Sequence, residues 1–298
     1  MQPVSRRFRA VDILLLILML LPFLCGIAVK VLFVPPGEGM DIAGAAILFT
    51  IPMPLQDLPV TESQVNSLLV ILFVTFMSLY LTHGIRAGVK TRRQHAAEWI
   101  VEKTEGLVRD NMGEFFAGFA PLVGAVLALS ACSSLLTLIG LFPPTSDLNI
   151  VGGWALLVFI LITYYKMKCG PIHYLKSFAE PVALLTPMNL ISEIATPVSM
   201  AFRHFGNVLS GVVISTILGA ALSGLTSKLL GWLPGFLSDI PFLQIGIPAI
   251  LSLYFDLFSG CLQAFIFAML TMLYVASAFP LEDYMQRKEK KQSKSTIN

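Results

Sequence analysis

The segment AFRHFGNVLSG, residues 201–211, places an arginine inside a long apolar stretch of the chain. Between residues 194 and 227 there is no Asp or Glu, and the only other side chain that could carry a charge is His204. A guanidinium stays protonated in proteins, so Arg203 cannot become neutral to avoid the cost of burial. Near the centre of a bilayer that cost is about 2.5–3.5 kcal/mol on insertion scales. An arginine in this position indicates a function.

The composition of the whole chain is that of an integral membrane protein. Of its 298 residues 56% are hydrophobic and only 13% are charged, and the mean hydropathy is +0.79. A water-soluble domain could not bury that much apolar surface. We therefore expect an all-α integral membrane protein with about six helical spans. The apolar runs that predict these spans lie at about 11–34, 67–83, 115–142, 151–165, 185–225 and 241–279.

The basic residues predict how the spans are oriented. Seventeen of the twenty Lys and Arg residues lie in the amino-terminal segment, in 84–114, in 166–180 and in the tail. The segments between them, 35–66, 142–150 and 226–240, hold only Lys228. Because cytoplasmic loops carry the excess of basic residues, six spans with both termini in the cytoplasm fit this distribution throughout.

The amino-terminal apolar run has two interpretations. Its three preceding arginines resemble the start of a signal peptide, but the run is long and no small-x-small cleavage site precedes VPPGEG. We expect an uncleaved anchor. The chain then divides into residues 1–50, an extra membrane anchor with an outward loop, residues 51–280, the core, and residues 281–298, a basic cytoplasmic tail.

The last two apolar segments are too long for simple spans. As helices, residues 197–225 and 241–279 would measure about 43 Å and about 58 Å at 1.5 Å per residue. Both exceed the ~30 Å hydrocarbon thickness by more than an ordinary tilt absorbs. We expect two long, strongly tilted or bent helices that form a hairpin. The candidate bend points are Pro187, Pro197, Pro241 and Pro248.

Each long segment carries one formal charge deep inside it, Arg203 in the first and Asp256 in the second. On α-helical spacing each charge shares a face with small and polar residues, which suits close helix approach and water. Those residues are Asn207, Ser210 and Gly211 for the arginine, and Gly260 and Gln263 for the aspartate. The alternative is a buried ion pair that only joins the two helices, although charges inside a membrane are usually functional.

Other polar residues have ordinary structural interpretations. His204 points about 100° away from the face of Arg203, which favours packing over proton transfer. Ser134 and Thr137 could bond back to their own helix, and Asp147 and Asn149 read as turn residues in an outward loop.

The sequence offers no motif for metal or cofactor chemistry. Four cysteines lie in or beside apolar spans without CxxC spacing, which favours packing roles over metal ligation or disulfides. They are Cys25, Cys132, Cys169 and Cys261. HExxH, P-loop and GxSxG motifs are missing from the sequence, so we expect no cofactor, no metal and no nucleic-acid partner.

Two motifs in the long segments are characteristic of one family. They are PMNLISEIATPVSMAFRHFGNVLSG (187–211) and LQAFIFAMLTMLY (262–274), supported by VTESQVNSLLVILFVTFMSLYLT (60–82), EWIVEKTEGLVRDNMGE (98–114) and LIGLFPPTSDLNI (138–150). With these motifs the chain resembles subunit a, the membrane stator subunit of the rotary F-type ATP synthase. The resemblance covers about residues 50–280 and leaves the first fifty residues outside.

The resemblance implies roles for single residues in ion translocation. Arg203 matches the family's essential arginine, Asn207 the asparagine of its FGN motif, and Gln263 the glutamine facing that arginine. Asp256 falls where the family usually has a Glu or His of the outward ion path, and Glu193 matches an acidic position upstream of the arginine. Ser210, which shares the polar helix face with Arg203, is a further candidate residue for ion translocation.

The chain departs from the family pattern at three positions. Some members carry a second acid nine residues after the arginine, where this chain has Val212. His204 stands where leucine is common, and Thr137 where an asparagine is common. These departures bear on the outward ion path.

The resemblance implies that the chain translocates ions, most simply protons, through two offset half-channels next to a rotating c-ring. This ion flow would be coupled to ATP synthesis. The implied partners are the c-ring of small membrane subunits, the peripheral-stalk subunit b, membrane lipid and, indirectly, the catalytic head. The chain itself would be a non-catalytic, multi-pass subunit in a bacterial-type cell membrane. The choice between H⁺ and Na⁺ lies mainly in the ring. The competing class is a secondary transporter or ion channel that uses an intramembrane Arg/Asp pair, but it predicts internal repeats, and the sequence shows none.

Overall fold

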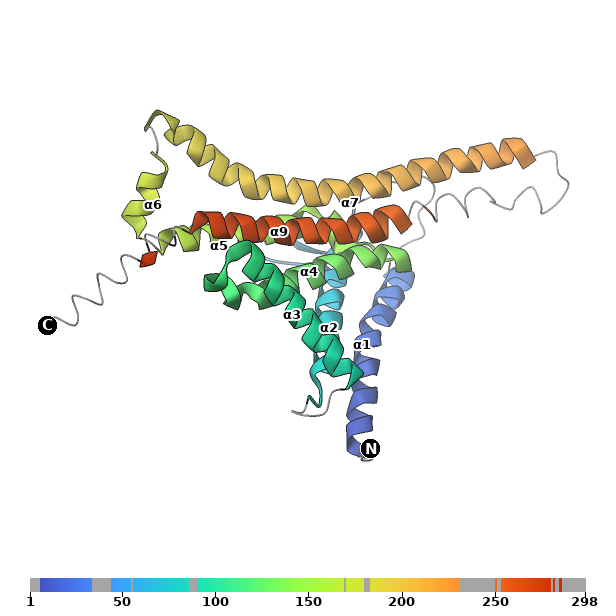
Figure 1. Cartoon of the computed structure of the whole chain (residues 1–298). Helices are drawn as coiled ribbons and strands as arrows, with labels where there is room; N and C mark the ends of the chain where they lie inside the picture. The colour runs from blue at the N-terminus through green and yellow to red at the C-terminus, as the bar shows by residue number, and fades with distance from the viewer. Residues whose placement is uncertain are drawn as a thin grey trace.

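The computed structural model describes residues 6–33, 44–54, 56–85, 91–168, 170–179, 183–230, 250, 253–279, 281 and 284–285. Within these residues six helices are long and apolar enough to cross a membrane, which confirms the expected all-α membrane class (Figure 1). The helices are α1 Arg6–Phe33, α2 Glu62–Thr82, α3 Arg92–Met112, η1 Glu114–Phe119, α4 Ala120–Leu135, η2 Leu136–Ile139, η3 Pro144–Ser146, α5 Leu148–Met167, α6 Pro171–Ser177, η4 Ala183–Leu185, α7 Thr186–Leu230, η6 Leu253–Ser259 and α9 Gly260–Ala278.

Helix α1 packs along α2 and forms one arm of the molecule (Figure 1). Near its carboxyl end the Lys30 ammonium donates a hydrogen bond to the Gly140 carbonyl after η2. Large apolar side chains elsewhere on α1, such as Ile17 and Leu24, are exposed. In a membrane this surface faces lipid or a neighbouring subunit.

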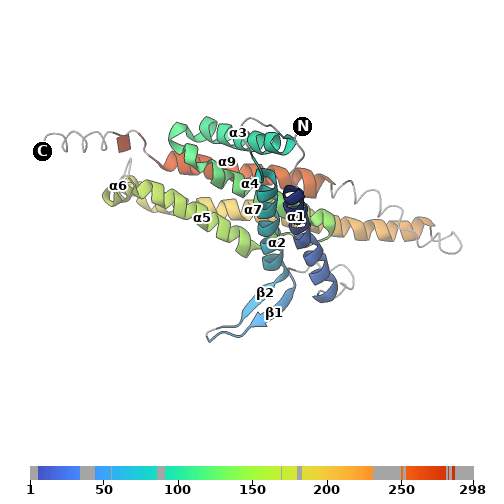
Figure 2. The same ribbon diagram turned by 90° about the horizontal axis from the view of Figure 1, so that it is seen from below.

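The segment between α1 and α2 contains a short β-hairpin that the sequence did not predict. Strands β1 Ile47–Ile51 and β2 Leu58–Thr61 pair antiparallel and project from the start of α2 (Figure 2). The apolar, β-branched sequence ILFTI suits a strand, and Pro59 is tolerated because both strands of a two-stranded sheet are edges.

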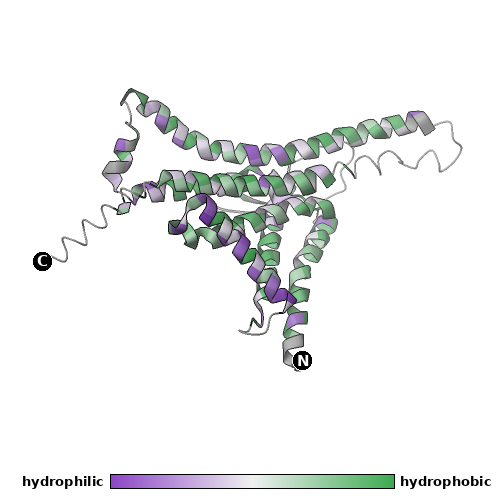
Figure 3. Ribbon diagram, viewed as in Figure 1, coloured by the Kyte–Doolittle hydropathy of each residue, from purple (hydrophilic) through white to green (hydrophobic). Residues whose placement is uncertain are grey.

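Helix α3 is the polar helix of the fold and is not among the spans (Figure 3). It starts at Thr91, whose hydroxyl oxygen accepts a hydrogen bond from the Gln94 backbone N–H at 3.2 Å. It ends at Gly113, which has a φ of +82°. Its buried face, including Val108 and Met112, packs on α4 and α9.

The main core lies between α4, α5 and α9, with contributions from α3, η1 and α7. Its buried apolar side chains include Val123, Val158 and Phe267, and Gly260 of α9 lies directly against Ser134 of α4. A Cβ built on Gly260 would lie 2.6 Å from the Ser134 Cβ, closer than real Cβ atoms approach. Only glycine fits at this point.

Helices α7 and α9 form the long, strongly tilted pair expected from the sequence. Helix α7 is 45 residues long, about 67 Å at 1.5 Å per residue. It curves across the molecule above α9, and both run across the direction of α1 and α2 (Figure 1). Pro197 lies inside α7, but Pro187 stands in its first turn, where proline is favourable and causes no bend. Pro241 and Pro248 lie outside the described residues.

The α-helical geometry expected for the start of the last span is wrong. Residues Leu253–Ser259 form a π-helix, and α-helical geometry begins only at Gly260. A π-helix bonds i to i+5, so each residue advances by a smaller angle than in an α-helix. The α-helical spacing that placed Asp256 in line with Gly260 and Gln263 therefore does not hold there.

Candidate functional site

Arg203 lies in the middle of α7 with its side chain exposed. None of the ion pairs among the described residues includes it. Asn207 and Ser210, at i+4 and i+7 on the same continuous helix, share its face as predicted. Hydrophilic bands interrupt the apolar surface of α7 near its middle (Figure 3).

The neighbouring part of this face is turned toward the start of the last span. The Ser259 hydroxyl donates a hydrogen bond to the Asn207 Oδ1 at 3.1 Å, and the Ser210 hydroxyl donates to the Asn207 backbone carbonyl at 2.9 Å. Gly211 comes so close to Phe255 that an added Cβ would lie 3.2 Å from the phenylalanine Cβ. The side-chain amide of Asn207 therefore bridges α7 to η6.

Gln263 and Asp256 complete the residues predicted on the last span. Gln263 is 4% exposed on α9, within the helix that packs against α7. The backbone of Asp256 belongs to η6, but its side chain lies outside the described part. Its role as an outward relay stays a prediction.

His204 points away from Arg203 and into the core. It is fully buried, and its ring meets the Trp154 and Phe267 rings edge to face at centroid distances of 6.0 and 5.5 Å. Its Nε2 lies 3.4 Å from the Ser130 hydroxyl, while its Nδ1 is buried without a partner among the described residues. The packing position expected from the helical angle is confirmed.

Glu193 is held in an ion pair that the sequence did not reveal. The Lys166 ammonium at the end of α5 donates to Glu193 Oε2 at 2.7 Å, and the Tyr174 hydroxyl donates to Oε1 at 3.3 Å. The Glu193 side chain is only 6% exposed. Burial, and next the Glu193 carboxylate, raise the pKa of Tyr174 above its ordinary value. Sequence reasoning counted Lys166 only as one of many loop charges.

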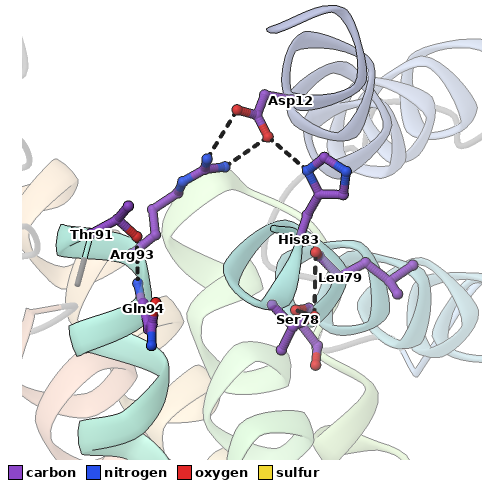
Figure 4. Close-up of polar contacts among 8 residues, drawn as sticks. Asp12, Ser78, Leu79, His83, Thr91, Arg93 and Gln94 are labelled. Atoms are coloured by element: carbon purple, nitrogen blue, oxygen red, sulfur yellow. Dashed lines mark hydrogen bonds and ion pairs between the residues drawn. The ribbon is translucent and has the colours of Figure 1, made fainter. Parts of the chain in front are cut away.

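A second polar cluster joins three helices where α1 begins. Asp12 of α1 accepts two hydrogen bonds from the Arg93 guanidinium, at 2.8 and 2.9 Å, and lies 3.1 Å from the His83 Nδ1 (Figure 4). The Arg93 guanidinium also lies over the Tyr80 ring at 4.8 Å. The hydrogen bonds that Arg93 donates to the Asp12 carboxylate raise the pKa of Arg93. Asp12 could have been identified from the sequence, because it is a single acid in an apolar run. The same pattern identified Asp256.

The expected back-bonding of Ser134 and Thr137 and the turn position of Asp147 are confirmed, whereas Asn149 lies in the first turn of α5. The Ser134 and Thr137 hydroxyls donate to carbonyls of their own helical segment, at 3.2 and 3.0 Å. Asp147 caps α5 by accepting from the Asn149 backbone N–H at 2.9 Å. It also accepts a hydrogen bond from the Ser63 hydroxyl, so this residue contacts α2 as well.

The cysteines form no cluster in the described part of the chain. Cys25, Cys132 and Cys261 are free thiols there, and Cys169 lies outside it. No group of three or more His, Cys, Asp or Glu residues that could hold a metal ion occurs among the described residues.

Comparison with known proteins agrees with this architecture. The ATP synthase A chain family matches residues 64–276. The chain is 30% identical to ATP synthase subunit a 1 of Crocosphaera subtropica, over 82% of this chain and 96% of that protein. It is 31% identical to ATP synthase subunit a of Priestia megaterium, over 74% and 94%, and 27% identical to the subunit a named sodium ion specific from Propionigenium modestum, over 82% and 88%. The chain therefore belongs to the ATP synthase subunit a family, as a multi-pass membrane subunit of a complex that couples ion translocation to ATP synthesis.

Proposed function

We propose that this chain conducts ions past Arg203 through two laterally offset half-channels, each reaching halfway across the membrane. The observation that carries the proposal is the state of Arg203 itself. It is an exposed, permanently charged side chain in the middle of a long apolar helix, without an ion-pair partner among the described residues. Such a charge in a membrane requires an anion or water beside it.

The anion would be the carboxylate that each small subunit of a rotating c-ring presents at mid-membrane depth. The fixed charge of Arg203 favours the ionised carboxylate, so the ring site releases its ion on reaching the arginine. The same charge repels cations and prevents a direct leak between the half-channels. The ring must then turn nearly a full circle to carry each ion between them, driven by about 2.3 kcal/mol per charge per 100 mV.

The residues around Arg203 would divide between the two routes. Glu193 and its partner Lys166 lie ten residues toward the start of α7, on the inner side if both termini are cytoplasmic. Asn207 and Ser210 lie toward the outer side, where the Asn207 amide already meets Ser259. Asp256 and Gln263 would complete the polar surface from the last span.

The proposed partners follow from the same placement. The face of α7 that carries Arg203 would meet the c-ring, the peripheral-stalk subunit b would bind elsewhere on the membrane surface of the chain, and the catalytic head would be reached through them. Residues 1–50 would form an extra anchor with an outward loop and 281–298 a cytoplasmic tail of a bacterial-type membrane subunit. We propose H⁺ as the ion. The name of the Propionigenium modestum relative shows that Na⁺ is the alternative within this family.

Arg203→Ala, Arg203→Lys and a control, Lys228→Ala, test the proposal in membranes that contain the assembled complex. Lys228 is the matched residue because it is an exposed cation on the same helix. We expect Arg203→Ala to abolish ion-driven ATP synthesis with normal assembly, and Arg203→Lys to fail largely, since an ammonium lacks the fixed fork of a guanidinium. Lys228→Ala should retain synthesis. Near-normal coupled synthesis in Arg203→Ala membranes would end the proposal.

A further inference from the structure

An apolar cavity of about 250 Å³ lies between α5 and α7. Each helix lines it with four residues at positions i, i+3, i+4 and i+7, counted from Gly152 on α5 and from Ile194 on α7. This spacing is one face of an α-helix, so the two helices turn these faces toward each other. Every lining residue is apolar, so the cavity offers a ligand no polar side chain.

The two helices touch on both sides of this cavity. At one end Ala201 of α7 packs in a small buried cluster with Val151 and Ala155 of α5. Toward the other end the Lys166 ammonium of α5 pairs with the Glu193 carboxylate of α7 at 2.7 Å. These contacts show that α5 and α7 run antiparallel, and they fix the separation of the helices beside the cavity.

Two residues explain why the space between the contacts is not filled by the protein. Gly152 has no side chain, and nothing outside its own part of the helix lies within 4 Å of a Cβ built there. Pro197 lies inside α7, where it has no backbone N–H to bond to the carbonyl four residues earlier. A helix bends readily at such a position. The cavity therefore follows from the sequences of the two facing helices.

The cavity lies on the side of α7 opposite to Arg203. At about 100° per residue, Ile194 and Ala201 are rotated about 180° and about 160° from Arg203 around the helix axis. Ala201 is two residues from Arg203, about 3 Å along that axis. Both helices are long and apolar enough to span a membrane, and the lining residues of α5 lie near its middle. The cavity is therefore at hydrocarbon depth, behind the arginine.

The position and chemistry of the cavity select its occupant. Its rim is open, because Leu156, Ile194 and Val198 are exposed. Water needs polar partners, and apolar cavities stay dry. A helix of another subunit, about 10 Å wide, is too thick to enter. A single acyl chain is narrow and apolar, and acyl chains surround a span at this depth. Contacts with the chain restore the dispersion attraction that the lining of an empty cavity loses.

We propose that this cavity binds one acyl chain of a membrane lipid and that the bound chain supports α7 from behind, opposite to Arg203. The supporting role rests on the proposed function, in which the Arg203 face of α7 meets the c-ring. The ring would then press on one side of α7 while the chain fills the space on the other side. Binding of the chain does not depend on the proposed function, because it follows from the cavity alone.

Photolabelling tests the binding. The complex is reconstituted in phosphatidylcholine–phosphatidylglycerol vesicles that contain a phosphatidylcholine with a diazirine in the middle of one acyl chain, irradiated, and analysed by peptide mass spectrometry. Leu156 and Leu157 are matched, because both are exposed leucines of α5 but only Leu156 lines the cavity. We expect at least about fivefold more label on Leu156, the ratio that a preference of about 1 kcal/mol gives. Equal labelling would mean contact with bulk lipid only and would overturn the proposal.

Filling the cavity gives a second measurement of binding. Gly152→Leu places a side chain in the open space of the cavity. The control is Gly153→Leu, because Gly153 also has nothing near a built Cβ but does not line the cavity. Gly152→Leu should remove the excess label from Leu156, and Gly153→Leu should retain it. Unchanged labelling in Gly152→Leu would contradict the assigned site. If Gly152→Leu does not assemble, the smaller Gly152→Ala should lower the label in the same direction.

The choice of lipid tests the supporting role. Vesicles made of lipids with methyl-branched chains offer no chain slim enough for the cavity. In these vesicles the ion-driven ATP synthesis of the wild type and of Gly153→Leu should fall severalfold relative to straight-chain vesicles. Gly152→Leu should lose much less, because its own side chain occupies the cavity. An equal loss in all three proteins would show that the chain does not support α7.

The proposal and the proposed function fail in distinguishable ways. Arg203→Ala should abolish coupled synthesis and leave the labelling of Leu156 unchanged. If Leu156 and Leu157 are labelled equally while Arg203→Ala still abolishes coupling, the lipid site is wrong and the proposed function stands. If Arg203→Ala couples normally, the proposed function and the supporting role are both wrong, whereas excess label on Leu156 would still establish the binding site.

Discussion

The contact between Gly260 of α9 and Ser134 of α4 allows a prediction whose size follows from the structure. An alanine at position 260 would bring its Cβ to 2.6 Å from the Ser134 Cβ and 3.1 Å from the Ser134 Oγ. Neither atom is the far end of a flexible side chain, so α9 and α4 must move apart. Overpacking of this kind costs about 1–3 kcal/mol. Gly260→Ala should therefore shift the equilibrium toward the disassembled state by about five- to 150-fold, since 1.4 kcal/mol is about tenfold.

Ser134→Gly provides the matched compensation. Alone it removes the hydrogen bond from Ser134 to the Ser130 carbonyl and places a glycine in α4, which costs about 0.5–1 kcal/mol in helix propensity. Combined with Gly260→Ala, it removes the Ser134 Cβ with which the new methyl group would clash. The double variant should be more stable than the sum of the single changes predicts, by at least about 1 kcal/mol, as expected for residues in contact.

The assay is the fraction of complex that stays assembled in detergent as temperature rises, with ion-driven ATP synthesis measured on the same preparations. Gly153→Ala on α5 is the control, because nothing lies within 4 Å of a Cβ at that position. It should leave stability unchanged or slightly raised. If Gly260→Ala matches wild type in both measurements, or if Ser134→Gly gives no recovery, the close approach of α4 and α9 does not fix their spacing.

Three further changes test the polar clusters. Asp12→Asn should leave Arg93 without its carboxylate partner and destabilise the packing of α1 by about 1.5–3 kcal/mol, the range for hydrogen bonds to charged groups. Faster proteolysis of α1 would measure this loss. Lys166→Met should strand the buried Glu193 carboxylate and lower complex yield, whereas Lys166→Met with Glu193→Gln should recover it. Because burial, and next the Glu193 carboxylate, raise the pKa of Tyr174, its neutral hydroxyl is favoured in the folded state. The resulting stability is present below about pH 10, the ordinary tyrosine value, and is lost as pH rises further, so Tyr174→Phe should flatten the decline in complex stability above that pH.

The fold was largely predictable because its signals are long-range averages. Composition and the length of the apolar runs predicted the class and the six spans without any contact information. The β-hairpin was missed because its strands are short and Pro59 argues against a strand. The π-helix at Leu253–Ser259 was missed because an extra residue in a helical turn leaves no mark on an apolar sequence.

Single functional residues could be predicted from the sequence, but pairs of residues that contact each other across the fold could not. Arg203 stands out because a charge in an apolar run is costly, and its face with Asn207 follows from helical spacing. The partner of Glu193 could not be found in this way, because Lys166 lies 27 residues away and reads as one of many loop charges. The unpartnered state of His204 Nδ1 depends on packing against α4, α5 and α9.

The charges on α7 restrict where the anion for Arg203 comes from. Glu193 is the only acid in this helix, and it lies ten residues away, about 15 Å along the axis. Its carboxylate already accepts hydrogen bonds from Lys166 and Tyr174, so its charge is committed. A guanidinium in a membrane then needs water or an anion beside it, and such an anion would come from Asp256 or from another subunit. A permanent pair with Asp256 would hold Arg203 in one place and lower its attraction for any passing carboxylate. The Lys166–Glu193 pair leaves no uncommitted acid on α7 for Arg203, which is what the proposed exchange with ring carboxylates requires.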